Sequence, residues 1–223
     1  MSESVADFIT DISIYIAILP LLVGSLRLSY LNKPQLRLFT YLVVSTCFEV
    51  FTEIIRHFRS QMEMTEDYIT LPLLHIYTLI ELVLIANIYR EHIQQIFSKK
   101  QIFGILGFFA LFAMINAAWI DGLFNFNPHA RALECILILL LTLTYFFRLL
   151  KDLRVGRLEK EPLFWISAGF LIYFSGAMLI FVVSEYISNS QEVMLTAWGI
   201  HGLLNIGANI LYAVALWVKP HKT

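Results

Sequence analysis

Acidic residues and histidines recur inside long apolar stretches of this chain. Glu49, Glu53 and His57 follow one another at intervals of four residues, which places all three on one face of a helix. At the centre of a membrane-spanning helix an ionisable group costs roughly 2.5 to 3.5 kcal/mol on insertion scales, so such groups usually face the interior of a helix bundle. Carboxyl and imidazole groups in that setting can bind a polar or cationic ligand, carry protons or hold a metal ion.

Other apolar stretches contribute further groups of the same kind. The predicted ligand-binding or proton-sensing residues are Glu49, Glu53, His75, Glu81, Glu134, His201 and Asn205. Four of them, each in a different stretch, lie roughly 6 to 12 Å inside the same boundary at a rise of about 1.5 Å per residue. These four are Glu53, His75, Glu134 and His201. The other three lie a turn or more deeper, and the matching depths predict one shared polar pocket.

The apolar stretches that carry these residues are long enough to be membrane helices. Of the 223 residues, 58% are hydrophobic and only 15% are charged, which excludes an ordinary water-soluble domain. A bilayer core about 30 Å thick requires about 20 apolar residues in a helix. We predict an all-α membrane protein, a single seven-transmembrane-helix bundle over residues 1–223. The expected spans are approximately 9–28, 38–57, 69–89, 102–120, 130–149, 163–186 and 194–217.

The charges in the connections predict the orientation of the bundle. Lys and Arg are retained on the cytoplasmic side of membranes. Thirteen of the sixteen Lys and Arg residues fall on alternate connections and on the C-terminal tail, beginning with Arg27, Lys33 and Arg37. The opposite face collects acidic residues such as Glu66 and Asp121. We therefore predict that the N-terminus lies outside and the C-terminus in the cytoplasm, so that the polar pocket opens toward the outside.

Small residues recur in the last two expected spans. They include Gly169, Gly176, Gly202 and Gly207. Small residues allow the backbones of membrane helices to approach closely. We interpret them as sites of close helix packing and assign them no function.

Short motifs in most of the chain carry a resemblance. They are His75-Ile-Tyr-Thr-Leu-Ile-Glu81, Arg131-Ala-Leu-Glu134, Phe164-Trp165-Ile-Ser-Ala-Gly169, Tyr173-Phe174-Ser175-Gly176, Trp198-Gly-Ile-His201 with Asn205 and Asn209, and Ala215-Leu-Trp217. In these motifs the chain resembles an uncharacterised family of seven-helix membrane proteins that is common in Bacteroidota. The resemblance covers nearly the whole chain from the second span onward and implies a location in the bacterial inner (cytoplasmic) membrane. It implies no activity and no catalytic residue.

The leading hypothesis is a sensory or small-ligand-binding module. The outer pocket would bind a small polar or cationic ligand, or protons, and helix movement would reach a cytoplasmic or membrane signalling partner. Histidine titrates near physiological pH, which suits a pH sensor. The basic loop from Lys151 to Lys160 is explained by orientation or by anionic lipid, and it also offers a surface for such a partner. The lipid bilayer is the one partner that composition predicts, and we expect no nucleic acid.

The second hypothesis is a metal-dependent intramembrane hydrolase. Its ligands would be Glu53, His75, Glu134 and His201, and the metal would activate a water molecule. Ceramidase-like and progestin-receptor-like membrane hydrolases bind zinc through a His-x-x-x-His pair on the last helix, whereas here the second position is Asn205. No metal or other cofactor is required by the sequence, and we favour a protein that is not an enzyme.

Two further alternatives stay open. A b-type haem could be held between His75 and His201. The intramembrane acids are also compatible with a proton-coupled transporter, although the chain has no internal repeat. A retinal protein is excluded, because the last span has no lysine for a Schiff base.

Overall fold

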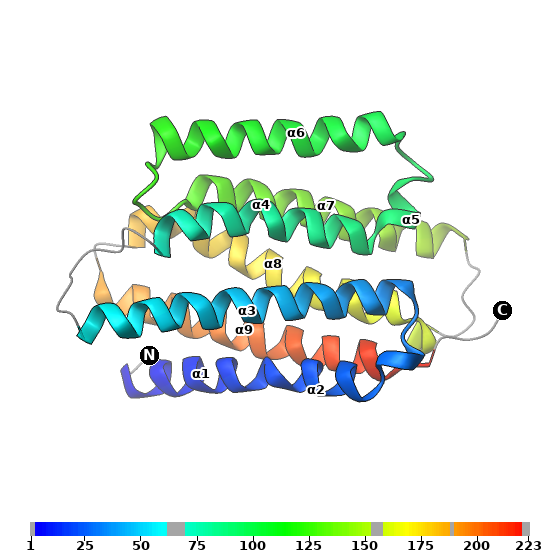
Figure 1. Cartoon of the computed structure of the whole chain (residues 1–223), viewed down its shortest axis with the longest axis horizontal. Helices are drawn as coiled ribbons and strands as arrows, with labels where there is room; N and C mark the ends of the chain where they lie inside the picture. Colours follow the sequence, from blue (N-terminus) through cyan, green and yellow to red (C-terminus); the bar gives the residue numbers. More distant parts are fainter. Residues whose placement is uncertain (1–2, 62–69, 153–157, 188–189, 220–223) are drawn as a thin grey trace.

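The structure is a computed structural model that describes residues 3–61, 70–152, 158–187 and 190–219. Within these ranges every regular element is a helix and no strand occurs. The longer helices are α1 (Glu3–Ile16), α2 (Ile18–Leu26), α3 (Lys33–Gln61), α4 (Thr70–Ile88), α6 (Lys99–Ile115), α7 (Pro128–Asp152), α8 (Pro162–Ile187) and α9 (Gln191–Trp217). The short elements are α5 (Arg90–Ile93), the 3₁₀ turns η1 (Leu28–Tyr30) and η3 (Leu158–Lys160), and the π-helical turn η2 (Asn116–Ile120) that continues α6. Figure 1 shows the long helices lying side by side.

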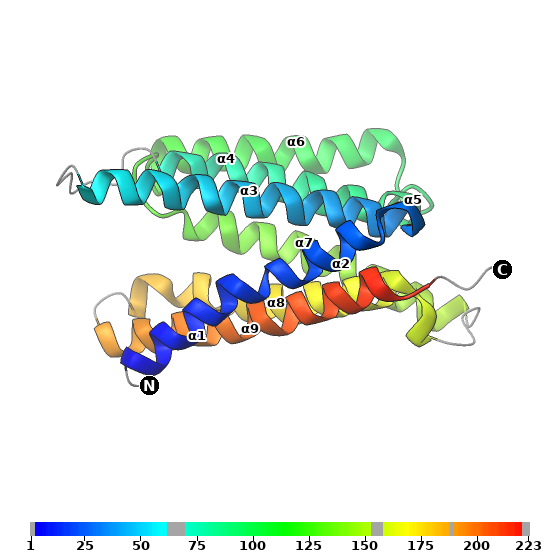
Figure 2. The same ribbon diagram turned by 60° about the horizontal axis from the view of Figure 1, so that its bottom comes forward.

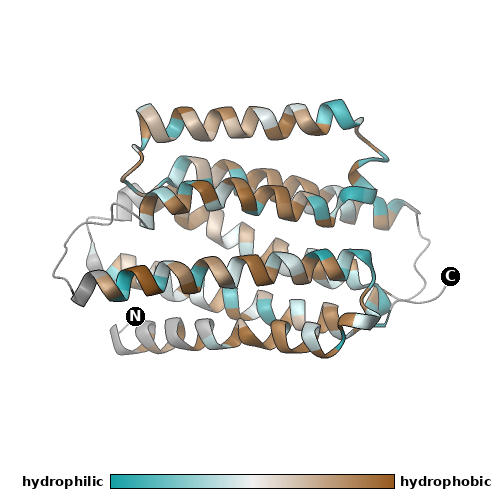
Figure 3. Ribbon diagram, in the orientation of Figure 1, coloured by the Kyte–Doolittle hydropathy of each residue, from teal (hydrophilic) through white to brown (hydrophobic). Residues whose placement is uncertain are grey.

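Six helices in the described ranges are long and apolar enough to cross a membrane. They are α3, α4, α6 continued by η2, α7, α8 and α9, and they correspond to the last six expected spans. Apolar residues predominate along these helices, and hydrophilic residues collect toward their ends at α5 and at the start of α3 (Figure 3). The chain is therefore an all-helical integral membrane protein, as its composition predicts.

The first expected span, 9–28, is divided into two helices. α1 ends at Ile16 and α2 begins at Ile18, so neither piece has the length of the other six helices. Pro20 accounts for the break, because a proline has no amide hydrogen and its ring clashes with the carbonyl four residues earlier, here that of Ile16. Ala17, the residue between α1 and α2, keeps helical dihedral angles (φ −61°, ψ −22°). The two helices consequently follow one another across the length of the bundle, as Figure 2 shows.

The helices pack unequally. α9 packs along α8 and also against α1 and α2. α7 packs along α8 and against α4, and α4 packs along α3. α6 makes few contacts with its neighbours α4 and α7, and it stands apart from the other helices in Figure 1.

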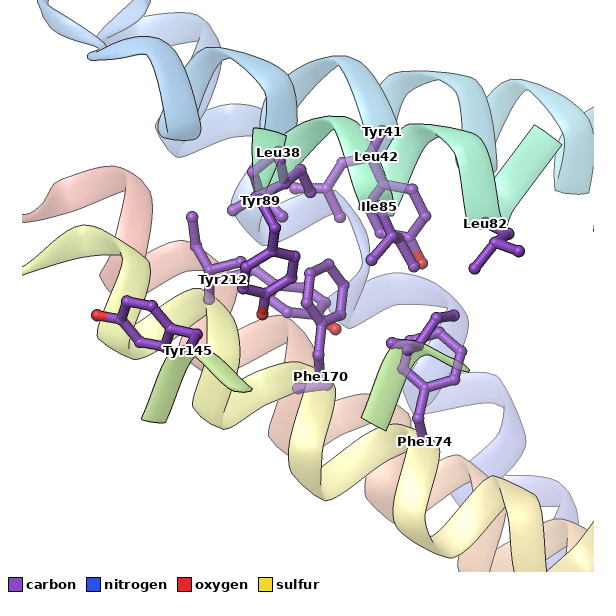
Figure 4. Packing of buried hydrophobic residues seen from close by; sticks show 14 of the residues in the cluster. Leu38, Tyr41, Leu42, Leu82, Ile85, Tyr89, Tyr145, Phe170, Phe174 and Tyr212 are labelled. Carbon is purple, nitrogen blue, oxygen red and sulfur yellow. The ribbon is translucent and has the colours of Figure 1, made fainter. Parts of the chain in front are cut away.

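An aromatic cluster centred on Phe170 occupies the core between four of the helices. The Phe170 ring is fully buried, and its centroid lies 5.8 Å from that of Tyr41, 6.3 Å from that of Tyr89 and 5.4 Å from that of Tyr212. The Tyr89 hydroxyl lies 2.8 Å from the Ser167 hydroxyl, so this polar group is paired within the core. Tilted and edge-on ring pairs of this kind are favourable beyond the area they bury. Figure 4 shows these rings converging from α3, from the junction of α4 and α5, and from α8 and α9.

Close packing at small residues is confirmed at three of the predicted positions. A Cβ atom at Gly169 would lie 2.5 Å from the Tyr212 ring, and one at Gly176 would lie 2.2 Å from Leu204. Gly202 of α9 approaches Ile9 of α1, with 3.0 Å from the position of a Cβ atom to the Ile9 side chain. At Gly207 nothing in the described ranges lies within 4 Å of that position, so this glycine is not needed for packing.

Two polar contacts tie the start of α3 to other helices. The Gln35 amide donates to the carbonyl oxygens of Ala215 (2.8 Å) and Val218 (2.9 Å) at the end of α9. Arg37 forms an ion pair with Glu91 of α5, and its hydrogen bonds hold the pKa of the Glu91 carboxyl below its usual value. These contacts set the position of α3 relative to α9 and α5.

The contact between α8 and α9 should be sensitive to a single methyl group. Gly169→Ala should lower the free energy of unfolding by about 1–3 kcal/mol, because the added carbon overlaps the buried Tyr212 ring. The measurement is unfolding of the purified protein by SDS in mixed micelles. Gly107→Ala on α6 is the control, since nothing in the described ranges lies within 4 Å of its added carbon and helix propensity favours alanine. Equal stability of the two variants would contradict the assigned packing.

Candidate functional site

A buried guanidinium group near the start of α7 lies between two carboxyl groups. Arg131 Nη1 lies 2.5 Å from Glu81 Oε2 and 2.9 Å from Glu134 Oε2. The three side chains are 8%, 3% and 0% exposed. Glu134 reaches Arg131 because a spacing of three residues places both on one face of α7, whereas Glu81 comes from α4. A charge buried in this way is tolerated only when it is paired and hydrogen-bonded.

Tyrosine hydroxyls and an aromatic ring complete the surroundings of this ion pair. The hydroxyls of Tyr41 (2.9 Å) and Tyr77 (3.2 Å) donate to Glu81 Oε1. The Arg131 guanidinium carbon lies 5.2 Å from the centroid of the Phe181 ring, in cation–π contact. Side chains of α3, α4, α7 and α8 therefore meet around one charged group.

A polar cavity of about 260 Å³ adjoins the ion pair. It lies between α3, α4, α8 and α9 and also borders Ala17, where α1 gives way to α2. At roughly 30 Å³ for each water molecule, this space would hold about nine waters or a ligand of similar size. Its polar lining consists of Tyr41, Ser45, Thr46, Glu49, Thr52, Tyr77, Glu81, Arg131, Tyr173, His201, Asn205, Asn209 and Tyr212.

The side of the cavity formed by α9 carries an imidazole and two amides. The Tyr173 hydroxyl of α8 lies 3.2 Å from Nε2 of His201. The Asn209 side-chain amide donates to the backbone oxygen (2.9 Å) and to Oδ1 (2.8 Å) of Asn205. His201, Asn205 and Asn209 face the cavity together because each four-residue step returns nearly to the same side of a helix.

Most of the predicted site residues meet at this cavity. Glu49, Glu81, His201 and Asn205 line it, and Glu134 is joined to it through Arg131. Glu49 borders the cavity and is otherwise exposed. The predicted convergence of carboxyl, imidazole and amide groups from separate helices is therefore present for five of the seven residues.

Glu53 and His75 lie outside the cavity. Glu53 is exposed and forms an ion pair with Arg56 on its own helix, at 3.2 Å. The buried His75 places Nε2 3.2 Å from the backbone oxygen of Asn125, in the segment before α7. The position of a residue along a helix predicts the depth of its side chain in the membrane but not the direction in which the side chain points. Each step of four residues turns that direction by about 40° around the helix axis. Their direction, not their depth, separates these two residues from the shared pocket.

Comparison with known proteins adds no assignment to this geometry. No protein-family model, curated protein or solved structure matches the chain. The resemblance to a seven-helix family of Bacteroidota therefore stays a prediction. The chemistry of the site has to be derived from its own residues.

The alternative metal site is not assembled. Within the described ranges no three His, Cys, Asp or Glu side chains are placed to hold a metal ion, and the set Glu53, His75, Glu134 and His201 is dispersed. Between Glu81 and Glu134, where a cation would be held, the structure has the guanidinium of Arg131. The haem arrangement has the same difficulty, because His201 lines the cavity and His75 does not.

Sequence reasoning missed the residue at the centre of the site. Arg131 counts as an outer-face charge when only the connections are considered. Its spacing of three residues from Glu134 is the signal that could have identified it, since that spacing permits an ion pair within one helix. In the same way Tyr77 lies four residues before Glu81, on the same face of α4.

The ion pair should dominate the stability of this region. Arg131→Met should lower the free energy of unfolding by about 3–5 kcal/mol, because two carboxyl groups would stay buried without their partner. Arg56→Met removes the exposed pair with Glu53 and should cost less than about 1 kcal/mol. Unfolding by SDS in mixed micelles measures the free energy of unfolding of both variants.

A rescue variant separates the charge from the shape of the side chain. Adding Glu81→Gln and Glu134→Gln to Arg131→Met removes the unpaired charges and should recover much of the lost stability. A single Arg131→Met variant as stable as Arg56→Met would show that the buried ion pair is not essential.

Proposed function

We propose that this protein binds a small, positively charged polar molecule in the cavity between α3, α4, α8 and α9, and that binding is sensed through helix movement. The observation that supports this is the charge of the cavity. Glu49 and Glu81 line the cavity and Glu134 adjoins it, whereas Arg131 is the one cation among the lining residues. The site therefore has two more carboxyl groups than cations. Negative charge within a bilayer is costly, so a bound cation is favoured and an anion is opposed.

The aromatic groups of the cavity support a cationic ligand as well. Phe48 and Tyr77 stack with their centroids 4.5 Å apart, and Tyr173 and Tyr212 line the other side. The faces of such rings attract ammonium groups, most strongly when water is excluded. Aromatic walls next to a carboxylate are suited to an organic amine more than to a hydrated metal ion.

Glu49 is the carboxylate available to this ligand. Glu81 and Glu134 are engaged by Arg131, whereas the Glu49 carboxylate makes no hydrogen bond or ion pair with the described residues.

A proton is the smallest cation that the site could take. Glu134 would be its acceptor, since Oε1 of this carboxyl has no hydrogen-bond partner in the described ranges.

The position of the cavity suits transmission along the bundle. Gln35 of α3 is hydrogen-bonded to the carbonyl oxygens of Ala215 and Val218, so the two helices that border the cavity are joined again at the C-terminal end of α9. A ligand that shifts α9 against α3 would change this end contact. A cytoplasmic or membrane signalling partner would bind there, where Lys160 and Lys219 line a common surface pocket.

The proposed topology has seven crossings, with α1 and α2 together forming the first. The start of α1 and the end of α9 lie at opposite ends of the bundle in Figure 1, which supports an odd number of crossings. Thirteen of the sixteen Lys and Arg residues support a cytoplasmic C-terminus and a cavity in the outer half. The resemblance supports the bacterial inner membrane as the location.

Binding of an amine should depend on Glu49. We expect ethylammonium and tetramethylammonium ions to raise the melting temperature of the purified protein, and ethylene glycol to have no effect. Glu49→Gln should weaken the binding of these ions about tenfold, the typical loss of one charge-assisted contact. Calorimetric titration in detergent gives the affinities.

Glu53→Gln is the matched control for this measurement. Glu53 lies one turn further along α3, is exposed, and does not line the cavity. Its replacement should leave the affinity for both ions unchanged. Loss of binding in both variants, or no binding by the unaltered protein, would refute the proposed site.

The topology can be measured with single cysteines in a background that carries Cys47→Ala and Cys135→Ala. A membrane-impermeant maleimide applied to intact spheroplasts should label Ser2→Cys and Ser190→Cys. It should label Ser29→Cys only after the membrane is permeabilised. Labelling of Ser2→Cys and Ser29→Cys from the same side would mean that α1 and α2 do not cross the membrane.

A further inference from the structure

A second cavity lies on the other side of the bundle, between α6 and the pair formed by α4 and α7. Its volume is about 250 Å³, and its walls are almost wholly apolar, with Leu82, Ala86, Leu106, Leu137 and Leu141 among them. It exists because α6 makes few contacts with α4 and α7. We take the volume of one methylene group as similar to that of a water molecule, roughly 30 Å³. About eight carbons of a hydrocarbon chain would then fill the cavity.

Three polar groups gather at one end of this cavity. The Tyr145 side chain is 4% exposed, and its hydroxyl has no hydrogen-bond partner among the described residues. Arg148, one turn later on α7, makes no ion pair in the described ranges and donates only a long hydrogen bond of 3.4 Å to the backbone oxygen of His92. The His92 ring packs edge-on to Tyr145 at 5.2 Å. The Tyr145 hydroxyl can donate a hydrogen bond into the cavity, and Arg148 can pair there with an anion.

The charged side chains that line this cavity and the one beside it are cations. Burial and the nearby Arg148 hold the pKa of His92 below its usual value. Arg148 lines the cavity beside Tyr145, and the Glu161 carboxyl also acts on Tyr145 from nearby. A neighbouring cavity of about 460 Å³ shares Ala86, Ile93, Ile102 and Leu106 with this one and is also lined by Arg90 and Lys99. Three cations therefore surround the same end of α6.

We propose that this cavity binds an acyl chain of an anionic phospholipid, whose phosphate accepts hydrogen bonds from Arg148 and from the Tyr145 hydroxyl. The apolar walls match the hydrocarbon chain, and basic pockets between membrane helices at the cytoplasmic side suit acidic head groups. The lipid would fill the gap beside α6 that protein side chains leave open. This site is separate from the polar cavity and does not depend on the function proposed for it.

Native mass spectrometry of the full-length protein with added dioleoyl phosphatidylglycerol or dioleoyl phosphatidylcholine tests the proposal. Phosphatidylglycerol should bind preferentially, and Arg148→Gln should weaken its binding about tenfold, as expected for one charge-assisted contact. Lys151→Gln is the matched control, because Lys151 lies three residues later on α7, is exposed and does not line the cavity. Equal binding of both lipids, or an equal loss in both variants, would overturn the proposal.

Two further variants test the cavity and the hydroxyl separately. Ile105→Trp fills the cavity from α6 and should abolish binding of phosphatidylglycerol, whereas Leu111→Trp on an exposed part of the same helix should not. Tyr145→Phe removes only the unpartnered hydroxyl. It should leave the melting temperature in lipid-free detergent unchanged or higher, and it should reduce the stabilisation that phosphatidylglycerol gives. Unchanged lipid binding by Ile105→Trp, or unchanged stabilisation of Tyr145→Phe, would overturn the proposal.

Discussion

The guanidinium group of Arg131 is the interaction on which the arrangement of the bundle depends. It joins α7 to α4 through Glu81 and contacts α8 through the Phe181 ring, and the Tyr41 hydroxyl extends the network from Glu81 to α3. In a bilayer no solvent is present to satisfy a group that loses its partner. Rotation of any of these helices would break a charged contact, so the ion pair sets the direction in which each helix faces.

The polar network and the aromatic core are parts of one packed structure. Tyr41 belongs to both, because its hydroxyl donates to Glu81 while its ring meets the edge of Phe170. Phe170 contacts Tyr89 in turn, and Tyr89 lines the apolar cavity beside α6. A continuous series of contacts thus connects the two cavities. A ligand that displaced Glu81 would first move Tyr41, which is hydrogen-bonded to it. Densely packed interiors transmit such a displacement to neighbouring side chains.

The sequence predicts the helices better than the directions in which they face. Apolar length located six long helices, because the thickness of the bilayer imposes a minimum length on any crossing. The break near Ala17 follows from Pro20 alone and could have been foreseen from the lost hydrogen bond to Ile16. The separation of Glu53 from Glu49 could not be foreseen, since the directions of the two side chains differ by only about 40° around α3. Which of the two borders a cavity is decided by where α4 and α9 lie.

The site and the close packing of α8 on α9 have a common origin in one helix face. Gly169, Tyr173 and Gly176 lie at spacings of four and three residues, which places all three on the side of α8 that meets α9. The glycines let the two backbones approach, with Tyr212 and Leu204 occupying the space above them. At this separation the Tyr173 hydroxyl lies 3.2 Å from Nε2 of His201. The residues that look purely structural therefore also determine where the imidazole lies in the cavity.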